Sequence, residues 1–164
     1  MAWKLAAAIW LATYVGAAAQ ELVPPALNAP EVIAARQDTM RQLEAMWLML
    51  SDLTARPGAL DRKAAAEGAE IMAGLLGDMQ VQYPEGSFVP PTEAVAEVRR
   101  DWSDFLQLAA TAQGHALALR DAALDDDKAL AAKALAELEA DCSTCHLRFS
   151  PGIRTDLRPW PGVR

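Results

Sequence analysis

The stretch that decides the fold runs from Asp127 to Phe149 and reads DKALAAKALAELEADCSTCHLRF. Alanine, leucine, lysine and glutamate are strong helix formers, and an aspartate in front of them suits a helix start. Pro151 and Gly152 follow and end such a segment. We therefore predict one long helix, and its last turns carry the only two cysteines of the chain.

Those cysteines stand in the pentapeptide Cys142-Ser143-Thr144-Cys145-His146, which has the spacing of a c-type haem attachment site. In such a site two thiols add to the two vinyl groups of the porphyrin, and the adjacent imidazole reaches the iron. On a helix the three side chains share one face, because they are three or four residues apart. The pattern predicts one haem c, attached covalently through Cys142 and Cys145, with His146 as a metal ligand.

Other readings of these residues are weaker. A thioredoxin-like dithiol would lie beside a strand, and the run before Cys142 has no strand pattern. A structural zinc site needs four ligands, whereas the chain has two cysteines and two histidines, of which His115 is far away in sequence. A disulfide between Cys142 and Cys145 would have poor geometry on a helix. We interpret His115 as a surface or interface residue.

The first nineteen residues have the pattern of an export signal. Lys4 precedes a short apolar stretch, and small residues up to Ala19 suit a cleavage site. The apolar stretch is too short to cross a bilayer comfortably, so an uncleaved membrane anchor is the weaker alternative. We expect residues 1–19 to be a cleaved signal peptide, and the protein to be periplasmic.

The remainder of the chain is long enough for one domain. We expect residues 20–150 to form a haem-binding bundle and residues 151–164 to form a tail rich in proline and arginine. The formal net charge of −7 would become −8 when Lys4 is removed. Because an acidic surface repels nucleic acid and anionic lipid, we expect no nucleic acid partner and no stable membrane insertion. We expect redox partner proteins with a basic docking face.

Proline and glycine residues divide the main domain into four helical segments. They run from about Pro30 to Ala55, from about Leu60 to Gln80, from Thr92 past Leu119, and from Asp127 to Phe149. No segment alternates with a period of two, so we expect no sheet. Four helices of similar length with short connections predict an all-α fold, an antiparallel four-helix bundle.

Each segment carries a stripe of residues at helical spacing, apolar except for Arg36, which we predict to face the core. In the first segment the stripe is Ile33, Arg36, Met40, Leu43, Trp47 and Leu50. In the second it is Ala64, Ile71, Met72, Leu75, Leu76 and Met79. In the third it includes Val95, Val98, Trp102, Phe105 and Ala109. In the fourth it is Leu130, Ala134, Leu138 and Cys142.

With its haem site on the last helix, the chain resembles the cytochrome c-prime family, the class II c-type cytochromes. Four stretches carry the resemblance in the family's order: Arg36-Gln37 with Met40, Tyr83 to Ser87, Val98 to Phe105, and Cys142 to His146. The resemblance covers nearly the whole chain after the signal segment. It implies a four-helix bundle around one covalent haem, and often a homodimer formed through the first two helices.

The resemblance also implies roles for three residues of the first helix. Met40 occupies the position that faces the iron, and a methionine there places the chain in the low-spin subgroup with histidine and methionine as axial ligands. The alternative is that Met40 only fills the core, as flexible methionines often do. The resemblance suggests that Arg36 and Gln37 contact the haem propionates, whereas the alternative for Arg36 is a side chain that extends to solvent.

The first functional prediction is therefore a periplasmic one-electron carrier, not an enzyme, whose haem iron is held by His146 and Met40. Two strong axial ligands keep the coordination similar in both oxidation states, which favours electron transfer. The second reading is a five-coordinate haem protein, in which Met40 leaves one face of the iron open to nitric oxide or carbon monoxide. The third is a haem-free interaction module or thiol oxidoreductase.

Overall fold

A computed structural model describes residues 28–153 of the chain. The predicted signal peptide and residues 154–164 of the predicted tail lie outside the described residues. The described part contains five α-helices and one 3-10 helix: α1 (Ala29–Ala55), α2 (Arg62–Gly77), η1 (Asp78–Gln82), α3 (Glu97–Arg100), α4 (Trp102–Leu124) and α5 (Lys128–Phe149).

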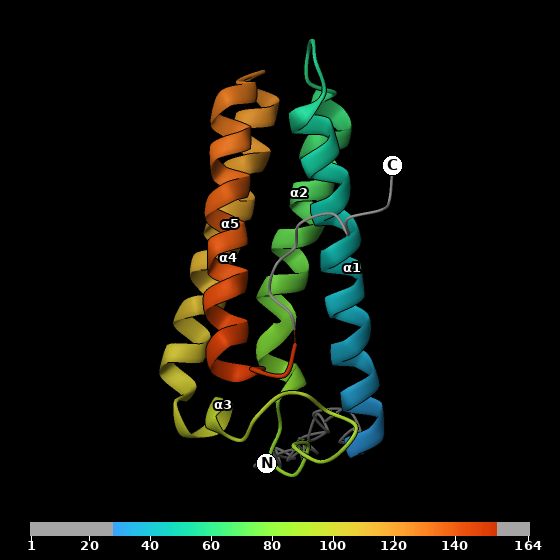
Figure 1. Cartoon of the computed structure of the whole chain (residues 1–164), viewed down its shortest axis with the longest axis vertical. Helices are drawn as coiled ribbons and strands as arrows, with labels where there is room; N and C mark the ends of the chain where they lie inside the picture. The colour runs from blue at the N-terminus through green and yellow to red at the C-terminus, as the bar shows by residue number, and fades with distance from the viewer. Residues whose placement is uncertain (1–27, 154–164) are drawn as a thin grey trace, which may run out of the picture.

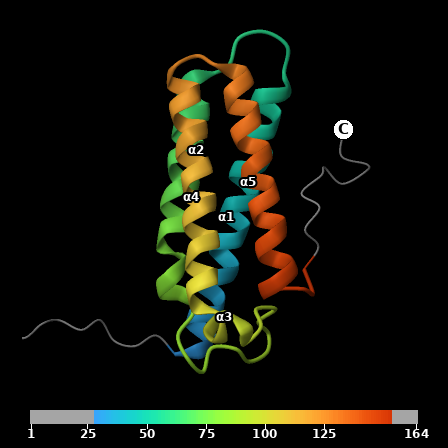
Figure 2. The same ribbon diagram turned by 90° about the vertical axis from the view of Figure 1, so that its left-hand side faces the viewer.

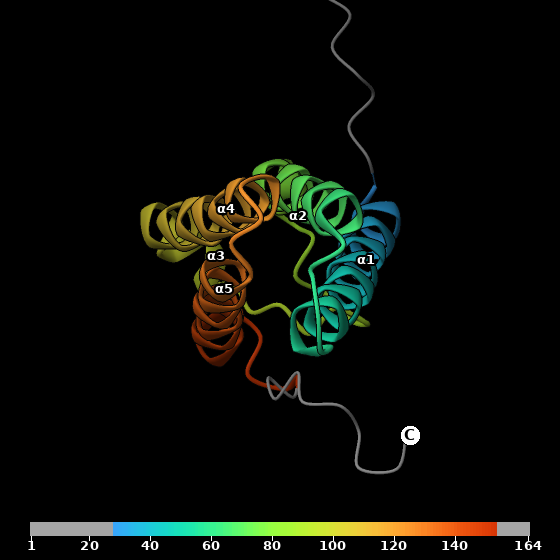
Figure 3. The same ribbon diagram turned by 90° about the horizontal axis from the view of Figure 1, so that it is seen from above.

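The four long helices run alternately up and down, as predicted for an antiparallel bundle (Figure 1). Seen from above, α1, α2, α4 and α5 follow one another around the bundle axis (Figure 3). The short helix α3 and the connection that leads to it lie across one end of the bundle (Figure 2). The all-α fold predicted from helical spacing is confirmed, and no strand occurs between residues 28 and 153.

The helix starts follow from side chains that cap free backbone N–H groups. Asn28 and Glu31 form a reciprocal capping box at the start of α1, with hydrogen bonds of 3.2 Å in both directions. Asp61 accepts a hydrogen bond at the start of α2, and Asp127 accepts one from the backbone of Leu130 at 2.9 Å. The predicted cap at Asp127 is confirmed, so α5 begins where the sequence indicates.

Small residues determine which helices pack closely. Buried alanines such as Ala69 and Ala73 on α2 face α4, which contributes Ala112 and Ala116. Without bulky side chains between them, α2 and α4 make extensive contact, and α4 makes similar contact with α5. By comparison α1 contacts its neighbours α2 and α5 more sparsely than α4 does. This uneven packing leaves space on the inner side of α1.

An aromatic cluster closes the core at the end of the bundle near α3. The Phe105 ring lies 4.7 Å from the Tyr83 ring, 5.3 Å from the Trp102 ring and 5.5 Å from the Phe149 ring, measured between centroids. Phe105 is 1 % exposed, so these contacts are almost free of water. Edge-to-face aromatic contacts stabilise such a cluster beyond the area they bury. The cluster joins α4, α5 and the connection after η1.

The start of the third long helix differs from the prediction. It was expected near Thr92, but α4 begins at Trp102, after the single turn of α3 and a break at Asp101. The backbone of this region hydrogen-bonds to the end of α5, where the Val95 N–H donates to the Phe149 carbonyl at 3.0 Å. Because that bond takes Val95 away from a helical hydrogen-bond pattern, the segment cannot join α4.

Two residues of the predicted core stripes are also wrong. Ile71 is 50 % exposed and Leu130 is 48 % exposed. Ala131, next to Leu130, faces the core instead, whereas Met72, next to Ile71, is buried as predicted. In an alanine-rich helix both neighbours are apolar, so helical spacing alone does not distinguish which one is buried. No helix among the described residues is long and apolar enough to span a membrane.

We predict that Phe105→Ala lowers the free energy of unfolding by about 3–5 kcal/mol, the usual effect of removing a fully buried aromatic ring. Urea denaturation followed by circular dichroism measures the change. The control is Leu130→Ala, because the half-exposed Leu130 side chain packs little; its effect should stay within about 0.5 kcal/mol. Similar losses in both variants would contradict the packing described here.

Candidate functional site

A cavity of about 1000 Å³ lies between α1 and α5 and reaches α2, η1 and α4. Ligand sites in proteins usually have volumes of roughly 300–1,000 Å³, so this one is large enough for a macrocycle. All six residues predicted as site residues line it: Arg36, Gln37, Met40, Cys142, Cys145 and His146. Residues far apart in sequence thus meet at one place.

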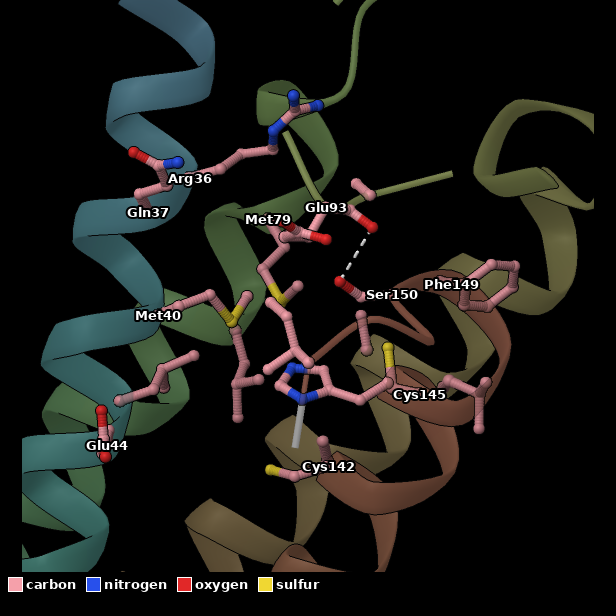
Figure 4. A pocket seen from close by; sticks show the side chains of 18 of the residues that line it. Arg36, Gln37, Met40, Glu44, Met79, Glu93, Cys142, Cys145, Phe149 and Ser150 are labelled. Carbon is pink, nitrogen blue, oxygen red and sulfur yellow. Dashed lines mark hydrogen bonds between the residues drawn. The ribbon is translucent and has the colours of Figure 1, made fainter. Parts of the chain in front are cut away.

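The wall formed by α5 carries the cysteine pair and the histidine. Cys142, Cys145 and His146 are each half-buried and belong to one turn of helix, as their spacing predicts. Figure 4 shows Cys142 and Cys145 on this wall, with Met40 and Met79 extending into the cavity from the opposite side. The two thiols are not joined in a disulfide. The geometry therefore presents two thiols and an imidazole to the same space.

Burial changes the acid–base properties of this wall. It raises the pKa of the Cys142 thiol to about 12, with further contributions from Cys145, Asp141 and Glu139, and it raises the pKa of Cys145 to about 11. Burial also lowers the pKa of His146 from 6.5. At neutral pH the imidazole is therefore neutral, which is the form that binds a metal. A dithiol oxidoreductase needs a thiol with a lowered pKa, so these values argue against that reading.

The opposite wall is apolar. Ile33, Met40 and Leu43 of α1 contribute to it, together with Met72 of α2 and Met79 of η1. Met40 is half-buried at the middle of this wall, which agrees with the direction predicted from the helical stripe. The wall carries no carboxylate, hydroxyl or amide at these positions. It therefore suits a flat apolar occupant and small neutral ligands better than ions.

Arg36 is the most unusual residue of the site, because its guanidinium is buried and no carboxylate between residues 28 and 153 pairs with it. Arg36 is 4 % exposed, so the alternative in which its side chain extends to solvent is wrong. It donates hydrogen bonds to the Ser87 carbonyl at 2.6 Å, the Ser87 hydroxyl at 3.1 Å and the Thr92 hydroxyl at 3.1 Å. Its carbon Cζ also lies 4.8 Å from the centre of the Tyr83 ring. Burial lowers the pKa of Arg36.

These contacts make Arg36 the link between α1 and the connection that closes one end of the cavity. Gln37 adds a weak hydrogen bond to the Pro91 carbonyl at 3.5 Å. The Ser150 hydroxyl donates to the Glu93 carbonyl at 3.1 Å, so the same connection is also held by the end of α5. The sequence did not identify Ser87 or Thr92 as site residues. Ser87 ends one of the stretches that carry the family resemblance, and Thr92 was expected only to begin a helix.

Two further polar residues lie at or near the cavity. Trp47 lines it, is 5 % exposed, and has an indole N–H that finds no hydrogen-bond partner in the described part of the chain. His115 lies behind the cavity wall, where its Nδ1 atom is 2.6 Å from a carboxylate oxygen of Asp141. The predicted surface histidine is therefore paired with α5. Within residues 28–153, no three histidine, cysteine or acidic side chains converge on a metal site, which disfavours the zinc alternative.

A covalent haem fits these residues. The cavity has room for the ring, one wall offers two protonated thiols and a neutral imidazole, and the other wall is apolar. The buried guanidinium of Arg36 lacks a negative partner among the described residues, and an acidic group on the occupant would provide one. Each of these features is explained by the same occupant.

Comparison with known proteins supports this assignment. A family model described as cytochrome C' matches residues 31–150. Over 85 residues the chain is 32% identical to a cytochrome c' from Rhodospirillum rubrum. The aligned residues are 51% of this chain and 58% of that protein. Over 86 residues it is 36% identical to a cytochrome c' from Pararhodospirillum photometricum. Here the aligned residues are 52% of this chain and 69% of that protein. The first match thus spans less than two thirds of the relative's length.

A solved structure shows the same fold. It is a nitric oxide complex of a mutant of cytochrome c prime from Alcaligenes xylosoxidans, with a TM-score of 0.68 and 17% sequence identity. The alignment covers 75% of this chain and 95% of that one. At this level of identity the likeness establishes the bundle and nothing finer.

We predict that Arg36→Gln lowers the free energy of unfolding by about 2–3 kcal/mol, since it removes buried hydrogen bonds of a charged donor. Urea denaturation of the purified protein measures this. Arg41→Gln on the same helix is the matched control, because Arg41 is exposed and, among residues 28–153, pairs with the exposed Asp38 alone. Its effect should not exceed about 1 kcal/mol. Equal effects of the two substitutions would show that Arg36 does not link α1 to the connection.

Proposed function

The chain belongs to the cytochrome c′ family, and from this premise we propose that it is a five-coordinate haem protein that binds nitric oxide or carbon monoxide. Members of this family carry one covalently attached haem c. The cavity wall on α1 supports the proposal, because Ile33, Met40 and Leu43 give it an apolar surface beside the charged lining residues Arg36, Arg41 and Glu44.

Family membership corrects the first functional prediction. The sequence was interpreted as a one-electron carrier with His146 and Met40 as axial ligands, but the family is known for five-coordinate haem that binds nitric oxide or carbon monoxide. The solved family member described above is itself a nitric oxide complex. A methionine at the right position on α1 was therefore insufficient grounds for a sixth ligand. The second reading replaces the first.

Three residues of α5 hold the cofactor in this proposal. Cys142 and Cys145 form the thioether bonds, and His146 provides the protein ligand through its neutral imidazole, which burial favours. When bound, the haem supplies an iron with one open axial position for a diatomic gas. Met40 forms part of the wall on that side and limits access through its size. Because the wall is apolar, it admits neutral gases and disfavours anions and water.

Arg36 and Gln37 hold the acidic edge of the haem in this proposal. Arg36 already uses three hydrogen bonds on the connection between η1 and α3, and a guanidinium has five N–H donors. The donors that remain can pair with a propionate, which would neutralise the buried charge. We further propose that the protein is exported to the periplasm after cleavage near Ala19, and that it forms a homodimer. Solved cytochromes c′ include dimers.

The covalent attachment is tested first. We predict that haem remains on the polypeptide after denaturation, and that the double variant Cys142→Ala with Cys145→Ala loses it. Haem staining of a denaturing gel, together with the intact mass, measures attachment. Replacing Ser143 by alanine is the control, because this residue lies between the cysteines without bonding the porphyrin. A colourless native protein with two alkylatable thiols would contradict the assignment.

Coordination is tested by the absorption spectrum. We predict that the reduced protein has a high-spin spectrum that shifts when carbon monoxide is added, because one axial position is open. Met40→Ala should leave the spin state unchanged and speed carbon monoxide binding by about tenfold, which corresponds to about 1.4 kcal/mol of steric barrier.

Met46→Ala provides the matched control for this measurement. Met46 is on the same helix and packs against the core, but it does not line the cavity. Its replacement should leave the rate of carbon monoxide binding within about twofold, because no barrier to the cavity is removed. A low-spin spectrum that is insensitive to carbon monoxide, and that becomes high-spin in Met40→Ala, would overturn the proposal.

A further inference from the structure

Tyr83 carries a buried hydroxyl group to which the proposed function gives no role. The residue is 6 % exposed and lines the cavity. Its ring packs against Phe105 at 4.7 Å and lies 6.5 Å from the Phe88 ring, measured between centroids. The hydroxyl forms no hydrogen bond with any residue between 28 and 153. Because buried tyrosine hydroxyls usually have a partner, the occupant of the cavity is the place to look for one.

The Tyr83 hydroxyl remains a hydrogen-bond donor at neutral pH. Burial raises the pKa of Tyr83 to about 12, with a further increase from Cys145 and a smaller decrease from Arg36. The influence of the Cys145 thiol indicates that the phenol oxygen lies near the α5 wall of the cavity. The phenol is therefore neutral and can donate one hydrogen bond to an acceptor in the cavity.

Arg36 brings further donors to the same end of the cavity. Its Cζ atom lies 4.8 Å from the centre of the Tyr83 ring. Its Nη2 donates to the Ser87 carbonyl and the Thr92 hydroxyl, and its Nη1 donates once, to the Ser87 hydroxyl. A guanidinium has five N–H groups, so the Nε–H and one Nη1–H are unused among residues 28–153. Unused donors of both side chains, and one uncompensated positive charge, thus lie close together.

These donors stand at the Arg36 end of the cavity and not beside Met40. Figure 4 shows Met40 further along α1 than Arg36, and four residues of helix correspond to about 6 Å at 1.5 Å per residue. Tyr83 follows η1 and belongs to the aromatic cluster at the end of the bundle. Neutral and charged donors together favour an anionic acceptor, such as a carboxylate, over a neutral gas.

We propose that Tyr83 donates a hydrogen bond to the same haem propionate that Arg36 binds, so that the two side chains hold one carboxylate between them. The inference rests on the proposed function, since it requires the covalent haem. A carboxylate has two oxygens, which can accept from a phenol and a guanidinium together. Both bonds favour the charged form of the acid and therefore lower the pKa of that propionate. Tyr83 is thus a binding residue for one edge of the cofactor.

Ionisation of the propionates in the full haem-loaded protein tests the proposal. Infrared spectra of protein whose haem propionates carry carbon-13 give the pH at which each propionate is half protonated. In Tyr83→Phe this midpoint should rise by about one pH unit for one propionate, a tenfold change, because a donor that favours the anion is lost. The other propionate should be unaffected. Phenylalanine keeps the ring and its packing on Phe105, so the variant removes the hydroxyl alone.

Phe88→Leu is the matched control for indirect effects through Arg36. The Phe88 ring also contacts Arg36, with 5.5 Å between Cζ and the ring centre, but Phe88 does not line the cavity. Its replacement should move the midpoint by less than about 0.3 pH units, because no donor to the propionate is removed.

A second variant keeps both the ring and the hydroxyl. Tyr83 is the only tyrosine between residues 20 and 164, so incorporation of 3-fluorotyrosine modifies this site alone in the processed chain. Fluorotyrosine is a more acidic phenol of nearly the same size, and therefore a stronger donor. It should lower the midpoint, which is the opposite of the effect of Tyr83→Phe. A purely structural role of Tyr83 would not reverse the sign.

Four outcomes would overturn the proposal. The first two are an unmoved midpoint in Tyr83→Phe and equal shifts in Tyr83→Phe and Phe88→Leu. The third is an unmoved or raised midpoint with fluorotyrosine. The fourth is a changed stretching frequency of bound carbon monoxide in Tyr83→Phe without a shifted midpoint, which would mean that the hydroxyl bonds the gas.

The spectrum of the unsubstituted protein with carbon monoxide reports the proposed function separately. A normal carbon monoxide shift with an unmoved midpoint would remove the Tyr83 bond and leave gas binding standing. A moved midpoint in a protein that is insensitive to carbon monoxide would support the Tyr83 bond and overturn gas binding. A protein without attached haem would overturn both.

Discussion

Cys142, Cys145 and His146 must share one face of a helix, and the rest of the bundle must leave that face an empty space. This constraint explains why the four helices do not pack evenly. Alanines allow α2, α4 and α5 to approach closely and form a continuous core on one side. The free energy of hydrophobic burial is gained there, so that α1 does not have to fill the centre. The cavity is therefore a consequence of where the small residues are placed.

A helix that stands away from its neighbours needs other contacts to hold its position. For α1 these contacts lie at its ends and along the face that packs against α2. Near its start, Arg36 bonds to the connection between η1 and α3, which Val95 and Ser150 join to the end of α5. A buried guanidinium without a carboxylate is unfavourable by itself. Its hydrogen bonds and the Tyr83 ring offset part of this cost, and a negatively charged cofactor would offset more. Structural and binding roles thus coincide in one residue.

The sequence predicted those parts of the fold that depend on local chemistry. The bounds of α1 and α5 follow from caps, prolines and glycines, and the meeting of Arg36, Met40 and the cysteines follows from helical spacing once a bundle is assumed. The separate turn of α3 and the partners of Arg36 depend on contacts between segments far apart in the chain. Leu130 and Ala131 illustrate a third case, because either could face the core and only the packed neighbours decide. A pattern within one segment contains no information on such choices.

The functional error has a related physical origin. Whether Met40 ligates the iron depends on how closely α1 approaches α5, and that distance is set by the sum of many contacts made by other residues. The position of α1 is set by the Arg36 hydrogen bonds and by its packing on α2. The type of residue at position 40 is the same in either case. Axial ligation in this fold is therefore a property of helix placement, and a single position in the sequence does not determine it.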